Sequence, residues 1–158
     1  MPMRIRRVVT GHDQDGQAVV AIDELCQNVI SRRPNHSGCV VWSTGEFPTD
    51  NSTDADGGAR KVASTDPNGT VFRLVEYGPG VAPRNHRTDS VDYAVVLSGE
   101  IDMEMDGTMV HLRAGDVLVQ RGTVHNWINR GTVPCVIAFV LVAAKPVERA
   151  GKLLHATN

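Results

Sequence analysis

The chain has 158 residues, of which 41% are hydrophobic and 22% charged, values typical of one globular domain with its own core. Its formal net charge is −2, so no basic field indicates a nucleic acid or an anionic membrane surface as partner. The cationic side chains of the first part are scattered or at most paired, and we expect them on a solvated face: Arg4, Arg6, Arg7, Arg32, Arg33 and Lys61.

The three cysteines, Cys26, Cys39 and Cys135, are odd in number and lack the spacing of a zinc finger. We expect reduced, buried thiols in a cytoplasmic protein. The opening residues MPMRIRRVVTG contain no apolar segment of the kind found in signal peptides. No apolar run approaches the roughly 20 residues that span a membrane, so no membrane partner is expected.

Short apolar strands separated by turn residues dominate the first part of the chain. RIRRVVT and QAVVAI flank GHDQDG, which predicts a hairpin, and LCQNVI and CVVWS follow on either side of RRPNHSG. TGEFPTDNSTDADGG is rich in Asp, Ser, Thr and Gly and predicts a surface loop, with a position across the mouth of a pocket as the alternative.

From Thr70 onward, seven short strands follow one another at roughly ten-residue spacing, a pattern typical of an antiparallel β-sandwich or barrel. They are TVFRLVEYG, VDYAVVLS, EIDMEMD, TMVHL, VLVQR, HNWIN and CVIAFVLVA. The last is apolar on both faces, which indicates burial on both sides, in part by a second subunit. KPVERAGKLLHATN is the only segment with a helical pattern.

Two motifs in this region resemble those of the cupin superfamily. The first, G-x5-H-x-H-x3-E-x6-G, is matched by Gly80, His86 and Gly99, with Thr88 in place of the second histidine and Asp92 in place of glutamate. The second, G-x5-P-x-G-x2-H-x3-N, is matched by GDVLVQRGTVHNWIN, in which Gln120 replaces proline and the segment is one residue short.

The resemblance implies an all-β double-stranded β-helix, a jelly-roll-like barrel. Residues 70–143 would form the barrel core and residues 1–69 would add strands and the acidic loop. Residues 144–158 would be a short tail, all within one structural domain. Cupins that resemble this chain are commonly dimers, which implies a homodimer here.

Three polar residues at the starts of strands indicate a metal site. His86, Asp92 and His125 can meet at one mouth of an antiparallel barrel, giving two imidazoles and one carboxylate with open coordination positions. These ligands suit Fe, Mn, Zn or Ni, and we expect one such divalent ion. Because Thr88 is a poor ligand and Asp92 is shorter than glutamate, a metal-free barrel is the alternative.

The substrate pocket is expected to include residues on both sides of these ligands. Arg84 and Arg87 would hold a substrate carboxylate, unless they are surface arginines. Strand alternation from Asp92 places Val96 and Ser98 inside, and alternation from His125 places Trp127 inside. Thr88 and Gln120 complete the set, with Gln120 able to orient His125.

We expect a structural role, and no part in the site, for several other residues. Arg73 and Glu76 would form a cross-strand salt bridge, and Trp42 and Tyr93 would be core or interface aromatics. The remaining histidines have no spacing partner and are expected to be exposed: His12, His36, His111 and His155.

The predicted function is that of a small metal-dependent enzyme acting on an organic carboxylate or carbonyl compound, by dioxygenase-like or by lyase or isomerase chemistry. Asp92 or a metal-bound water is the candidate base, and no dedicated general acid is visible. The alternative is a non-catalytic metabolite-binding cupin without metal.

Overall fold

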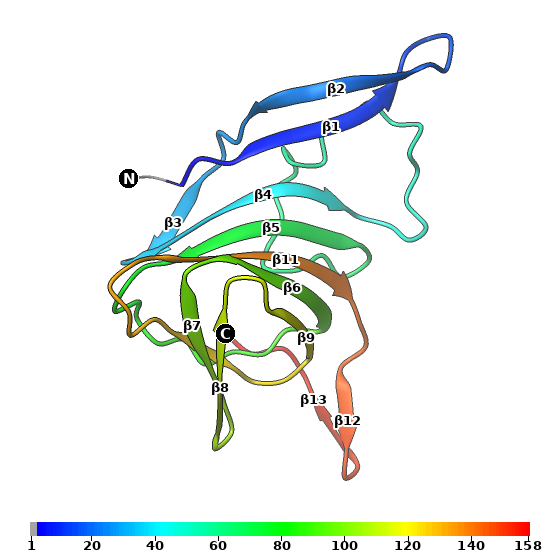
Figure 1. Ribbon diagram of the computed structural model, residues 1–158. Helices are drawn as coiled ribbons and strands as arrows, with labels where there is room; N and C mark the ends of the chain where they lie inside the picture. The colour runs from blue at the N-terminus through cyan, green and yellow to red at the C-terminus, as the bar shows by residue number, and fades with distance from the viewer. Residues whose placement is uncertain (1–2) are drawn as a thin grey trace.

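Alternating side chains along antiparallel strands build two facing sheets in the computed structural model, which describes residues 3–158 (Figure 1). The larger sheet has the strand order β3 (Ile30–Arg33), β4 (His36–Thr44), β5 (Thr70–Tyr77), β11 (Cys135–Ala143), β6 (Ser90–Ser98) and β9 (Val117–Arg121). The smaller sheet has the order β10 (Asn126–Ile128), β7 (Glu100–Met105) and β8 (Thr108–Arg113). The all-β double-stranded β-helix expected from the sequence is confirmed, and β5 to β11 are the seven predicted strands.

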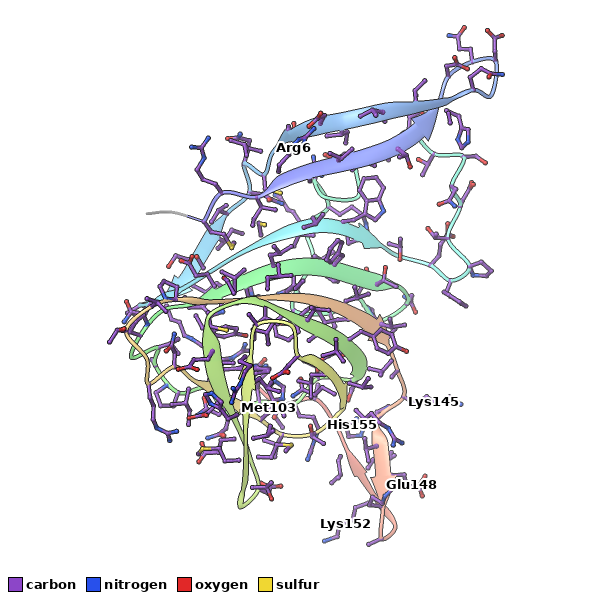
Figure 2. The ribbon with its side chains drawn as sticks, viewed as in Figure 1. Arg6, Met103, Lys145, Glu148, Lys152 and His155 are labelled. Atoms are coloured by element: carbon purple, nitrogen blue, oxygen red, sulfur yellow. The ribbon has the colours of Figure 1, made fainter. Side chains whose placement is uncertain are left out.

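The barrel core is formed by inward-facing side chains of both sheets. Along β6, Asp92, Ala94 and Val96 are buried, whereas Tyr93 and Val95 face outward. From the smaller sheet, Ile101 and Met103 are 2% and 3% exposed, and Figure 2 shows Met103 within the barrel. Apolar and polar residues alternate strictly along β7 because one of its faces packs into the barrel core and the other does not.

One register shift changes the expected alternation at the end of β6. Ile137 pairs with Val96 and Val136 pairs with Ser98, so Leu97 is left over as a bulge residue. Ser98 consequently becomes exposed, contrary to the prediction that it faces the pocket.

The predicted N-terminal hairpin is formed by β1 (Arg6–His12) and β2 (Ala18–Leu25), which lies apart from the barrel in Figure 1. Arg7 is buried and not solvated as predicted, because its guanidinium donates to Glu24 and to Asp56 of the long loop between β4 and β5. Arg6 is exposed and pairs with Asp23 (Figure 2). Arg7 therefore ties the hairpin to that loop.

The C-terminal segment forms a second hairpin and not the expected helix. β12 (Val147–Arg149) pairs with β13 (Lys152–Leu154), and the labelled Glu148 and Lys152 lie on it in Figure 2. Ala150 and Gly151 both have positive φ, 50° and 71°, which matches the two-residue turn of a tight hairpin. A hairpin therefore forms at the Ala150-Gly151 turn, because the segment is too short for a stable helix.

All three cysteines are buried and unbridged, as expected. Residues 3–158 contain no helix that is long and apolar enough to cross a membrane.

Candidate functional site

A cavity of about 360 Å³ opens into the barrel between the two sheets and the β4–β5 loop. This volume suits a small molecule. Its lining comes from β3, β4 and β5, from β6 and the segment before it, and from β9, β10 and β11. Residues 58–62 of the loop also line it, whereas the predicted loop stretch, residues 44–58, contributes Gly58 alone.

His86 and His125 lie side by side at this cavity. Their backbones form an isolated antiparallel bridge, with His86 N donating to His125 O at 3.1 Å and His125 N donating to His86 O at 3.0 Å. The ring centroids are 4.2 Å apart. The two cupin-like motifs, whose histidines are 39 residues apart in the chain, therefore meet through a pair of backbone hydrogen bonds.

Backbone carbonyls fix the tautomer of both imidazoles. Nδ1 of His86 lies 3.1 Å from Arg84 O, and Nδ1 of His125 lies 3.0 Å from Thr123 O. Because a carbonyl only accepts, each Nδ1 must carry the proton, which leaves Nε2 with a free lone pair. Burial and then the neighbouring His125 lower the pKa of His86 to about 4. Burial also lowers the pKa of His125, so both rings are neutral near pH 7.

Asp92 also lines the cavity, at the end of a short line of hydroxyl groups. The Ser90 hydroxyl donates to Asp92 Oδ1 at 2.5 Å and lies 2.9 Å from the Thr88 hydroxyl. Burial raises the pKa of Asp92, and the Ser90 hydroxyl partly opposes this rise. Thr88, which stands where cupins have a histidine, is thus an outer member of a hydroxyl chain that ends on Asp92.

The donor set fits a metal in part. Two neutral imidazoles with free Nε2 atoms are good ligands for a divalent transition ion. Across residues 3–158, however, no group of three His, Cys, Asp or Glu side chains lies in position to hold an ion. Asp92 is the single acidic side chain that lines the cavity, and its Oδ1 accepts a hydrogen bond from the Ser90 hydroxyl.

Four of the predicted pocket residues line the cavity and three do not. Arg84, Thr88, Gln120 and Trp127 are lining residues, and the Gln120 Nε2 group donates to Met103 Sδ at 3.2 Å and not to His125. Arg87 lies outside because its Nε donates to Gly122 O. Val96 is buried in the apolar core and Ser98 is exposed beyond the bulge, so neither reaches the cavity.

Sequence reasoning missed a set of lining residues from β3 to β5. Arg33, His36, Arg73 and Tyr77 all line the cavity, as do Arg32 and Lys61. His36 is half-buried and not exposed as predicted, and its ring lies edge-on to Tyr77 at 5.4 Å. Arg73 forms no salt bridge with Glu76, because residues three apart on a strand face opposite sides. Period-2 alternation with Val75 and Tyr77 was the signal that placed Arg73 inside.

Comparison with known proteins identifies the family. A double-stranded β-helix with paired imidazoles at its cavity is the architecture of the cupin class, and the family model described as "Cupin domain" matches residues 73–142. "Phomopsin biosynthesis cluster protein C'" of Diaporthe leptostromiformis is 38% identical over 94% of this chain and 83% of that protein. "Cupin-domain-containing oxidoreductase fogC" of Aspergillus ruber is 33% identical over 96% of this chain and 79% of that protein. The chain belongs to the cupin family.

Solved structures agree on the fold. A protein from Klebsiella pneumoniae with a double-stranded β-helix domain has a TM-score of 0.52 at 19% identity, covering 84% of this chain and 93% of that one. KdgF from Halomonas sp. has a TM-score of 0.51 at 16% identity, covering 73% of this chain and 86% of that one. At these identities the likeness concerns the fold alone.

Proposed function

We propose that this chain is a cupin enzyme that acts on a small organic carbonyl or carboxylate compound in the barrel cavity. One divalent transition metal would be held by His86 and His125, and by Asp92 after its side chain moves towards the two imidazoles. The observation that supports this proposal is the pair of neutral imidazoles whose Nδ1 atoms are tied to backbone carbonyls. Such an arrangement orients Nε2 and strengthens it as a ligand.

When bound, the metal would supply Lewis-acid polarisation of a substrate oxygen, or a site for dioxygen if it is iron. The chain's own residues bind and orient the substrate. Trp127 is 3% exposed and provides an apolar wall. The relatives named as oxidoreductases favour oxidative chemistry over isomerase or lyase chemistry.

Elemental analysis of protein purified without chelator or affinity metal tests the metal site. We expect about one equivalent of Fe, Mn, Zn or Ni in the wild type, and near-complete loss in His86→Ala and His125→Ala, because each removes one imidazole ligand. Asp92→Ala should reduce the metal content as well. His12→Ala is the matched control, since His12 is exposed on the distant hairpin, and it should retain the wild-type content.

Absence of metal from the wild type after reconstitution with Fe(II), Mn(II), Zn(II) and Ni(II) would contradict the proposal. A metal-free, metabolite-binding cupin would then be the function that the cavity supports. Unchanged metal content in both histidine variants would place any bound ion elsewhere in the protein.

A further inference from the structure

The cavity concentrates positive charge that the chain does not neutralise. Six cationic side chains line it, against the single carboxylate of Asp92, in a chain whose formal net charge is −2: Arg32, Arg33, Arg60, Lys61, Arg73 and Arg84. Within residues 3–158 only Arg60 of these six forms an ion pair, with Asp66. The other five therefore carry charge that a ligand can pair.

Two of these arginines have buried donors without acceptors. Arg33 and Arg73 each have a buried Nε–H that no acceptor among the described residues reaches. Arg73 donates through one Nη to Ala63 O, which fixes its guanidinium but leaves the charge unpaired. A buried, unpaired cationic donor is costly, so a site that keeps two of them is built for a ligand with complementary acceptors.

The cationic groups lie close enough to affect one another. Burial lowers the pKa of Arg33, and neighbouring Arg84 adds to that decrease. Burial also lowers the pKa of Arg73, with Arg32 adding to it. Asp92 forms no ion pair with an arginine of the described chain, and its attraction to Arg73 opposes only part of the decrease in the pKa of Arg73. A bound anion would reduce the electrostatic repulsion among these arginine side chains.

Arg84 connects this cationic region to the imidazole pair. It precedes His86 by two residues, and its carbonyl accepts the Nδ1–H of His86. His36 adds a neutral ring, because burial and then Arg33 lower its pKa to about 4, and its buried Nδ1 has no partner in residues 3–158. Cationic donors and candidate metal ligands thus line the same cavity.

We propose that the cavity recognises an organic carboxylate, whose carboxylate group is bound by Arg33, Arg73 and Arg84 while the rest of the molecule reaches His86 and His125. The Nε–H and Nη–H groups of a guanidinium match the two oxygens of a planar carboxylate. Guanidinium groups also match phosphate oxygens, so competition by inorganic phosphate is one arm of the test. This assignment names the substrate class of the proposed enzyme and rests on the same site.

Quenching of tryptophan fluorescence tests this, because Trp127 lines the cavity. The probe is benzoate, with benzamide as its neutral analogue, at constant ionic strength. We expect benzoate to bind at least roughly tenfold more tightly than benzamide, and Arg33→Gln and Arg73→Gln each to lower benzoate affinity by about tenfold or more with little effect on benzamide. Arg121→Gln, which removes an exposed charge outside the cavity, should change neither affinity.

Each outcome separates this proposal from that of the metal. The benzoate preference should persist in His86→Ala and in protein treated with chelator, because the arginines provide it. If the preference vanishes with the metal, the metal binds the carboxylate and the arginine assignment is wrong. Equal affinity for benzoate and benzamide, or tighter competition by inorganic phosphate than by benzoate, would likewise overturn it.

Discussion

His36 carries an imidazole that the folded chain keeps neutral. Its pKa falls from the ordinary 6.5 to about 4 because burial, and then Arg33 and Arg84, disfavour the charged ring. The unfolded chain therefore binds more protons than the folded chain between these two values, so the free energy of unfolding rises with pH across that window. This contribution is complete above about pH 6.5 and is lost as the pH falls towards about 4.

We expect His36→Gln to weaken the pH dependence of stability. Urea unfolding of the wild type should give a lower free energy of unfolding at about pH 4.5 than at about pH 7, with His36 responsible for roughly 1–3 kcal/mol of the difference. The variant should lose that part, whereas His12→Gln, at an exposed position, should not. Identical slopes in His36→Gln and the wild type would show that this ring does not titrate on unfolding.

The residues of the candidate site divide according to how they could be predicted. His86, Asp92 and His125 follow from local spacing, since each lies at a fixed place in a motif. Arg33, His36 and Arg73 come together only through the pairing of β3, β4 and β5, where His36 lies opposite Tyr77 across 41 residues of chain. Strand alternation with Val75 and Tyr77 marks Arg73 alone, and no local pattern joins it to Arg33 and His36, because Arg32-Arg33 has the sequence of an ordinary polar turn.

The segment that follows the C-terminal hairpin holds the His86 segment through Thr157. Arg87 N donates to Thr157 O, Thr157 N donates back to Arg87 O, and Arg87 Nε donates to Gly122 O, three residues before His125. Arg87 and the last residues therefore position both histidine-bearing segments from outside the cavity.

Removal of residues 147–158 should loosen this segment without unfolding the barrel. We expect faster amide hydrogen exchange in residues 84–88 and a weaker benzoate affinity, because the backbone bonds to Thr157 are lost. The melting temperature should change little, since most of the hairpin is exposed. Arg87→Met should give a smaller effect of the same kind. Wild-type exchange at His86 in both variants would show that the tail has no positioning role.

At the scale of elements, strand periodicity predicted β5 to β11 because each buries one face against the core. The tail was predicted wrongly because its short pattern is ambiguous, and the Ala150-Gly151 turn decides for a hairpin. The bulge at Leu97 also escaped prediction, since it depends on how β6 pairs with β11 and not on the sequence of β6 alone.

Over the whole molecule, the outer face of β6 and β9 is unusually apolar. Tyr93, Leu97 and Val119 are 51%, 50% and 56% exposed, and Val117 is 74% exposed. Tyr93 pairs with Val119 and Val95 with Val117, so these side chains form one continuous patch. A contiguous apolar patch of this kind marks an association surface.

We expect this patch to join two copies of the chain, because the apolar outer face of β6 and β9 in one copy can pack against the same face of the other. Light scattering should give about twice the chain mass of 17.1 kDa at micromolar concentration. Val119→Lys places a charge in the centre of the patch and should shift the protein to monomer, because burying an unpaired charge opposes association. Val133→Lys adds the same charge at a side chain 57% exposed in the loop before β11, and it should remain dimeric. A wild type that scatters as a clean monomer would rule out the dimer, and equal dissociation by both variants would rule out this face as its interface.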